Sequence, residues 1–170
     1  YFTRNEVVRN VAFYNDIYRY DLATGKERRI TLDLRGRDPH VSPDGKWLVL
    51  VMNRMGRTRI GLLNLEGRTG PAGERDIVPV TPWSEDQYET PRWSPDGKAI
   101  AVGLWRKGGW RDIRIIDAAG NVLDDVTNDR AVDSGPAWSP DGTALYFSSD
   151  RTGIFNLYAY DIAGRTLRQV

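Results

Sequence analysis

The chain has 170 residues, with 24 Lys and Arg against 23 Asp and Glu, one His, no Cys and six Trp. This near-neutral mixture gives no electrostatic case for binding nucleic acid or an anionic membrane surface, and no apolar run approaches the roughly 20 residues of a membrane-spanning helix. Disulfides are excluded without Cys, while a hydrophobic content of 40% is ample for a folded core.

Four markers recur along the chain in a fixed order. Ser-Pro-Asp-Gly occurs at residues 42–45, 94–97 and 139–142, and Arg-x-Gly at residues 54–56, 106–108 and 151–153. A short apolar stretch then ends at Asp21, Asn64, Asp117 and Asp161, and a closing Thr follows at Thr31, Thr81 and Thr127. The order divides the chain into a partial unit at approximately 1–35 and three units at 36–86, 87–131 and 132–170.

Each unit is expected to form four short strands. The first ends at Val41, Trp93 or Trp138, and Ser-Pro-Asp-Gly then forms a type I turn with Gly at the position of positive φ. Second strands are predicted at 47–52, 99–104 and 144–148, and third strands at 16–20, 59–63, 112–116 and 156–160. The second strands carry continuous apolar runs, which indicate cover on both faces, and no window has a helical apolar period.

The spacing also locates two insertions. Seven extra residues lie in the second unit, where Gly67–Gly73 is expected to be a flexible loop. In the first unit the extra residues fall around Asn5–Phe13. A unit of 40–50 residues with four antiparallel strands is a propeller blade, so the predicted fold is an all-β propeller, with Trp93 and Trp138 between blades.

The repeat resembles that of the TolB-like propellers. The resemblance rests on Pro91–Lys98 and Pro136–Gly142, with residues 145–153 and 157–161 continuing the signature, and it covers essentially the whole chain. Similar repeats occur in TolB, in the propellers of prolyl-oligopeptidase-like serine peptidases, and in envelope proteins that join them to other domains. The resemblance implies a propeller and favours a periplasmic or otherwise extracytoplasmic location.

The repeat count predicts an incomplete arc of three full blades and most of a fourth. The opening Tyr1-Phe2-Thr3-Arg4 has no signal peptide and suggests an internal start, and the first unit lacks its first strand. Two explanations are open. Either the remainder of a longer chain completes the ring, which we favour, or copies of this chain associate to close it.

No catalytic residue is expected in this chain. There is no Cys, no Gly-x-Ser-x-Gly elbow and no His-Glu-x-x-His motif. His40 and Arg92 occupy first strands, which line the channel of a propeller, so they are candidates for facing a ligand. The alternative is that both are ordinary lining or packing residues, because one His without a placed partner is weak support for acid–base chemistry.

Acidic residues gather between the fourth strand of one blade and the first strand of the next, close to the channel mouth. The candidates are Asp38, Glu85, Asp86, Asp129 and Asp133. They are expected to form either an acidic rim that receives a basic or peptide partner, or solvated turns. Their spacing matches no known calcium loop, so neither a metal nor a cofactor is predicted.

The register of the repeated Asp and Arg residues indicates a structural role. The Asp residues of the turns are expected to accept backbone N–H bonds, and Arg54, Arg106 and Arg151 to pair with nearby carboxylates. The loop Trp105–Trp110, with two aromatic and two cationic side chains, is either a protein-contact patch or packing over the loop.

These observations favour a non-catalytic scaffold of the bacterial cell envelope that recognises a protein or peptide partner through its channel-mouth loops. The alternative is the substrate-filtering propeller of a serine peptidase whose catalytic domain lies outside this chain. A third possibility is a spacer joined to an outer-membrane domain. No nucleic acid partner and no direct membrane insertion are expected.

Overall fold

Four antiparallel sheets follow one another along the chain in the computed structural model, which describes residues 1–8 and 12–170. The first has three strands, β1 (Phe2–Val8), β2 (Ala12–Tyr20) and β3 (Glu27–Arg29). The second contains β4 (Gly36–Val41), β5 (Trp47–Arg54), β6 (Arg57–Asn64) and β7 (Ile77–Pro79). The third contains β8 (Gln87–Trp93), β9 (Ala99–Trp105), β10 (Arg111–Asp117) and β11 (Val122–Asp125). The fourth contains β12 (Asp133–Trp138), β13 (Ala144–Ser149), β14 (Asn156–Asp161) and β15 (Thr166–Gln169).

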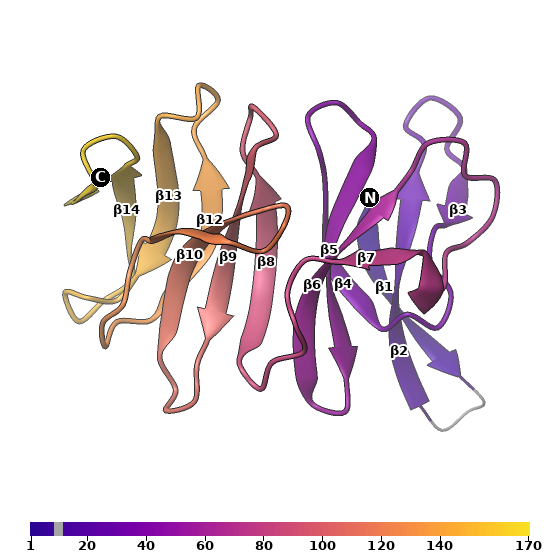
Figure 1. Cartoon of the computed structure of the whole chain (residues 1–170), viewed down its shortest axis with the longest axis horizontal. Coiled ribbons are helices and arrows are strands. Elements are labelled where there is room, and N and C mark those ends of the chain that lie inside the picture. The colour runs from indigo at the N-terminus through magenta and orange to yellow at the C-terminus, as the bar shows by residue number, and fades with distance from the viewer. Residues whose placement is uncertain (9–11) are drawn as a thin grey trace.

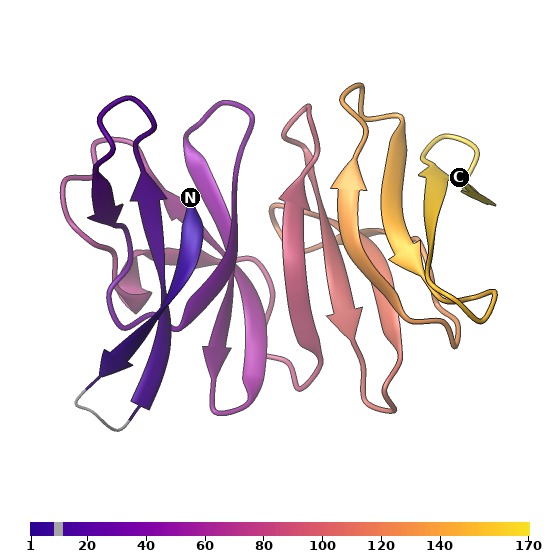
Figure 2. The same ribbon diagram turned by 180° about the vertical axis from the view of Figure 1, so that it is seen from behind.

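The sheets stand side by side as the blades of an arc, in chain order (Figures 1 and 2). In each complete blade the strands pair in sequence order, as in a meander. The three-stranded blade begins with the second strand of the repeat, because β1 pairs with β2 as β5 pairs with β6. The predicted all-β propeller arc, with three full blades and most of a fourth, is therefore confirmed.

The Ser-Pro-Asp-Gly turns have the predicted geometry. In the second blade the Gly45 N–H donates to the Ser42 carbonyl at 2.9 Å, and Gly45 has a φ of 75°. The Ser42 hydroxyl donates to the Asp44 carboxylate at 2.5 Å and accepts the Trp47 N–H at 2.9 Å. The same bonds recur in the next two blades. One local motif therefore forms the turn before the second strand of each complete blade.

The closing Thr of each unit caps the third strand. The Thr31 hydroxyl accepts the Ile17 N–H, and Thr81 and Thr127 accept from Ile60 and Ile113 in the same way, each at 2.9 Å. All three Thr residues are buried. Since a buried N–H left without a partner is costly, this bond explains why a small hydroxyl residue recurs there.

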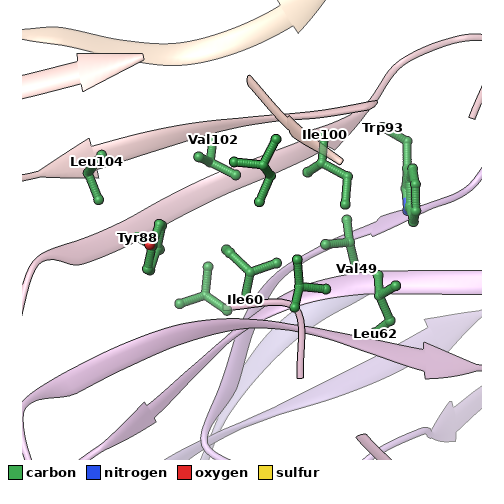
Figure 3. Packing of buried hydrophobic residues seen from close by; sticks show 11 residues of the cluster. Val49, Ile60, Leu62, Tyr88, Trp93, Ile100, Val102 and Leu104 are labelled. Atoms are coloured by element: carbon green, nitrogen blue, oxygen red, sulfur yellow. The ribbon is translucent and has the colours of Figure 1, made fainter. Parts of the chain in front are cut away.

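Three hydrophobic clusters fill the spaces between neighbouring blades. The second strands β5 and β9 each contribute to two clusters, because alternate side chains point to opposite faces. In β5, Leu48 and Leu50 pack against the first blade, while Val49 and Val51 pack against the third. Figure 3 shows the cluster between the second and third blades, where Val49, Ile60 and Leu62 meet the side chains of β8 and β9. The predicted cover on both faces is confirmed for β5 and β9, whereas in β13 of the last blade alternate residues are only half-buried.

The two tryptophans that end first strands lie between blades, as predicted. Trp93 is buried against the second blade (Figure 3). Trp138 packs beside the cluster between the third and fourth blades, and its indole N–H donates to the Arg92 carbonyl at 3.0 Å. Each ring thus joins its own blade to the preceding one.

The inserted segment of the second blade docks on the first blade. Its Ala72 is fully buried and forms a parallel bridge with Thr31, donating to the Ile30 carbonyl at 2.7 Å and accepting the Leu32 N–H at 2.9 Å. The expectation of a free flexible loop at Gly67–Gly73 thus missed this contact. The extra residues around Asn5–Phe13 belong to the long β1–β2 hairpin, except residues 9–11, which lie outside the described part.

Candidate functional site

The first strands of the complete blades form an inner wall along the arc. β8 contacts both β4 and β12, so these three strands lie side by side toward the axis. Each contains a β-bulge, at Arg37/His40, Glu89/Arg92 and Ser134/Ala137. The bulges were not predicted from the sequence, although each coincides with an X-Pro pair.

The residue before each proline has a positive φ. Asp38, Thr90 and Gly135 have φ values of 55°, 45° and 67°. Because proline has no N–H, it cannot donate to the pairing ladder, and a bulge accommodates it. The X-Pro dipeptides at residues 38–39, 90–91 and 135–136 were the available signal. A bulge re-aims nearby side chains, so these positions shape the polar surface of the wall.

Polar contacts link the inner strands of the second and third blades. The Arg37 guanidinium donates to the Tyr88 carbonyl at 2.7 Å, and the Asp38 carboxylate accepts the Thr90 N–H at 3.2 Å. His40 Nδ1 lies 3.0 Å from the Trp93 backbone nitrogen and accepts its N–H. Three bonds between two short strands fix the blades relative to one another at the wall.

His40 and Arg92 lie on the first strands β4 and β8 of this wall, and their proximity was not predicted. Burial, with a smaller contribution from the Arg92 guanidinium, lowers the pKa of His40 below its usual 6.5. Its Nδ1 accepts a hydrogen bond, so the neutral imidazole suits the position. Arg92 donates to the carbonyl of Pro91 at 2.9 Å, leaving its guanidinium half-buried beside the imidazole.

The predicted acidic residues divide between wall and connections. Glu85, Asp86 and Asp129 lie in connections between a fourth and a first strand, as expected. Asp38 and Asp133 do not, because Asp38 lies within β4 and Asp133 begins β12. The inner strands start earlier than the sequence indicated, since pairing continues on the N-terminal side of each bulge.

Most of these carboxylates contact cations. Asp38 pairs with its neighbour Arg37, and Glu85 lies 3.5 Å from Arg57. Asp129 and Asp133 share Arg151, at 3.5 and 3.2 Å. Asp133 is fully buried and Arg151 contacts both of its oxygens. These contacts make the rim mixed in charge.

The pairing predicted for the repeated Arg residues is present. Arg54 lies 3.4 Å from Glu74, and Arg106 lies 3.5 Å from Asp112. Asp112 is almost completely buried, a feature not predicted from the sequence. Burial raises the pKa of its carboxyl group above the usual 3.8, and the Arg106 charge opposes that rise.

Two shallow depressions lie beside the wall, next to the hairpins that join second and third strands. Arg54, Met55, Arg57 and Trp83 line the first, and Glu85, Gln87, Trp105, Arg106 and Lys107 line the second. We call these nine residues the hairpin face. Figure 1 shows the β5–β6 and β9–β10 hairpins at its lower edge, on the side opposite the Ser-Pro-Asp-Gly turns.

The described residues contain neither a grouped set of metal ligands nor a membrane-spanning helix. Across residues 1–8 and 12–170, no three His, Asp or Glu side chains are grouped so as to hold a metal ion. No helix in that part of the chain is long and apolar enough to span a membrane.

An arc of four-stranded antiparallel blades packed face to face defines a β-propeller. The chain belongs to the TolB beta-propeller domain family, whose sequence model matches residues 74–170. It is 28% identical over 159 residues to a TolB homolog of Chlorobium luteolum, covering 91% of this chain and 33% of that protein. It is 32% identical over 135 residues to an uncharacterized protein of Agrobacterium fabrum, covering 78% of this chain and 42% of that protein.

Solved structures give the same fold. TolB from Acinetobacter baumannii superposes with a TM-score of 0.75 at 25% identity, covering 91% of this chain and 37% of that one. A puromycin-hydrolyzing peptidase of Mycobacterium tuberculosis reaches 0.69 at 22% identity, covering 91% of this chain and 27% of that one. The chain therefore spans about a third of the TolB homolog and about two fifths of the A. fabrum protein.

Proposed function

We propose that this chain is a non-catalytic recognition scaffold that binds a protein or peptide partner at the mouth of the propeller. The observation that carries the proposal is the linked inner wall, where bonds between β4 and β8 hold polar side chains of two blades in one arrangement. A rigid scaffold with varied loops at one end is suited to binding, because little conformational freedom is lost when a partner docks.

The proposed binding residues lie on the wall and in the connections beside it. They are His40, Arg92, Asp38, Glu85, Asp86, Asp129 and Asp133. In this set Arg92 and Asp86 are best placed to meet a partner. The Arg92 side chain bonds to an adjacent carbonyl, and the hydrogen bonds of Asp86 are made by its backbone. Asp133, fully buried under Arg151, acts by positioning that arginine.

An extracytoplasmic location is part of the proposal. It is supported by membership of the TolB propeller family and by the likeness to TolB of A. baumannii. The partner is a protein or a peptide, and no cofactor is required for this kind of binding. Further propeller repeats, from a longer chain or from associated copies, would complete the ring.

Peptide selection on the purified chain tests this proposal. Peptides selected from a displayed library are expected to lose affinity at least about tenfold when the channel lining is altered by Arg92→Glu or the mouth by Asp86→Lys. Glu66→Lys is the matched control for Asp86→Lys, because Glu66 is exposed in the β6–β7 connection on the side opposite Asp86 and pairs with Lys46. Selected peptides that bind both the Arg92→Glu and the Asp86→Lys variants with wild-type affinity would contradict the proposal.

The second candidate is the propeller of a serine peptidase. It is favoured by 28% identity to an uncharacterized peptidase of Bacillus subtilis over 122 residues, covering 68% of this chain and 17% of that protein. A fluorophosphonate probe labels a reactive serine, so labelling of a longer polypeptide that carries this sequence would favour the peptidase. A polypeptide that contains the whole ring and resists labelling would favour the scaffold.

A further inference from the structure

The hairpin face combines exposed apolar groups with cationic groups outside the inner wall. The Met55 side chain is 87% exposed at the tip of the β5–β6 hairpin, and Trp105 is 43% exposed at the end of β9. Trp110, at the other end of the same loop, is 45% exposed. Met, Trp and Arg are enriched in protein interfaces, so this composition is typical of a docking surface.

The two depressions form one continuous surface because the connection between β7 and β8 joins them. Gln87 donates to the Gly56 carbonyl at 2.8 Å, next to Met55, and its backbone pairs with Trp105. Glu85 lies 3.5 Å from Arg57 on one side and lines the depression of Trp105 on the other. A ligand that occupies both depressions therefore crosses residues 85–87.

Cations are held against the aromatic rings of this surface. The Arg59 guanidinium lies 4.5 Å from the centre of the Trp83 ring, and the Arg111 guanidinium lies 4.5 Å from that of Trp105. Stacking restricts the rings and places positive charge beside them. The rings thus lose little freedom when an apolar side chain packs on them.

The charge balance of the depressions is positive. Arg54, Arg57, Arg106 and Lys107 line them, and Glu85 is the one carboxylate in the lining. Arg54 and Arg106 also contact Glu74 and Asp112, which are not part of that lining, so Arg57 and Lys107 are the cations left to meet a ligand. Lys107 has no carboxylate within 4.0 Å among the residues that the structure describes, and it lies in an exposed loop. The complementary ligand therefore carries negative charge.

We propose that the hairpin face binds an extended, acidic peptide segment of a protein partner, with apolar side chains on Met55 and Trp105 and carboxylates near Arg57 and Lys107. In an extended peptide, successive side chains alternate at about 3.3 Å per residue, so charged and apolar groups can meet the mixed surface in turn. Glu85, between the depressions, repels the continuous phosphate backbone of a nucleic acid. The inference rests on the proposed function and adds a binding surface that extends outward from the mouth, with Glu85 belonging to both.

The two methionines provide an internal control for the test. Met52 is buried, with 1% exposure, whereas Met55 is 87% exposed. The chain labelled with ¹³C at its methionine methyl groups is titrated with a synthetic octapeptide that alternates Glu with Phe or Leu. The Met55 methyl and the Trp105 indole N–H signals are expected to shift, while the Met52 methyl signal stays in place.

Charge reversal identifies the cations that bind the peptide. Arg57→Glu and Lys107→Glu are each expected to weaken peptide binding about tenfold, and binding weakens further as salt screens the charges. Lys98→Glu is the matched control, because Lys98 is an exposed lysine directly after the Ser-Pro-Asp-Gly turn on the opposite side. It is expected to leave the affinity unchanged.

Three outcomes would overturn the inference. A peptide with Lys in place of each Glu binds equally well; an oligothymidylate binds more tightly than the acidic peptide; or the acidic peptide leaves the Met55 methyl signal unmoved. If the peptide shifts the His40 ring signals and leaves Met55 unmoved, this surface is excluded while binding at the propeller mouth stands.

Discussion

The only histidine of the chain lies at a joint between two blades. His40 Nδ1 accepts the Trp93 N–H at 3.0 Å, and burial followed by the Arg92 charge lowers its pKa below 6.5. The unfolded chain therefore binds this proton at a higher pH than the folded chain. The free energy of unfolding is unaffected by this group above pH 6.5 and falls as the pH drops from there toward the native pKa.

Replacement of the histidine isolates this effect. His40→Asn is expected to flatten the dependence of the unfolding free energy on pH between 5 and 7, because His is the only side chain with an ordinary pKa in that range. Urea unfolding at several pH values measures it. A variant whose pH dependence matches that of the wild type in this range would show that His40 titrates alike in both states.

The aspartates of the Ser-Pro-Asp-Gly turns respond to pH in a lower range. In the third blade the hydrogen bond from the Ser94 hydroxyl, and then the Lys98 N–H, lowers the pKa of Asp96 below 3.8. A depressed native pKa contributes stability that is complete above the unfolded value of 3.8 and is lost as the pH falls through the native value.

Removing the serine hydroxyl tests this turn. Ser94→Ala deletes the bonds to Asp96 and to the Ala99 N–H, and the expected cost is about 1 kcal/mol at pH 7. The difference from wild type is expected to shrink near pH 3, where the carboxylates become protonated. Chemical denaturation at pH 7 and pH 3 measures the loss of unfolding free energy at each pH. An equal loss at both would argue that the Asp96 carboxylate does not contribute to it.

At the scale of the strand and turn, close backbone contacts between blades restrict which residues fit, as side-chain packing does. Gly120, in the turn between β10 and β11, has a φ of +88°, and a Cβ placed there would lie 2.1 Å from the Val80 carbonyl oxygen of the second blade. Gly108, in the β9–β10 hairpin, has a φ of +110° with open space around it. Substitutions at Gly120 and Gly108 therefore distinguish the cost of steric crowding from the cost of backbone strain.

Gly120→Ala is therefore expected to destabilise the fold more than Gly108→Ala. Strain alone at a positive φ costs about 1–2 kcal/mol, and moving two blades apart adds about 1–3 kcal/mol. Denaturant midpoints of both variants against wild type measure the difference. Equal costs would show that the blades adjust to the methyl group without loss of packing.

At the scale of the whole molecule, the arc is a row of blades in which each contacts its neighbours. The second blade takes part in two clusters, through Leu48 and Leu50 on one face and Val49 and Val51 on the other. The fourth blade takes part in one cluster, and Leu157 of β14 is 50% exposed, whereas Ile60 and Ile113 at the corresponding positions are fully buried. Local stability is expected to follow this difference.

Amide hydrogen exchange measures that gradient. The slowest exchange is expected in β5, β6 and β9, and the fastest among paired strands in β15, which pairs only with β14. Uniform protection across all four blades would indicate that the arc opens as one cooperative unit. Protection of β15 equal to that of β5 would contradict the expectation that local stability depends on how many neighbouring blades a strand packs against.

Much of the architecture was predictable because its causes are local. The turn bonds of Ser42 and Asp44 span only a few residues, and the apolar run from Leu48 to Val51 shows its two-sided burial directly. The site was less predictable. His40 and Arg92 were assigned to first strands, where the structure has them, but their proximity was not predicted. The positions of Asp38 and Asp133 depended on how far the bulged inner strands extend.

From its sequence alone, this protein was recognisable as a repeat of four-stranded blades with a TolB-like signature, because turn chemistry and strand alternation act between residues close in the chain. Only the tertiary structure decided which carboxylates are paired, that Ala72 docks on Thr31, and that Met55 and Trp105 each line a surface depression. Those contacts join residues far apart in sequence. Their formation depends on how the blades pack, which no local pattern specifies.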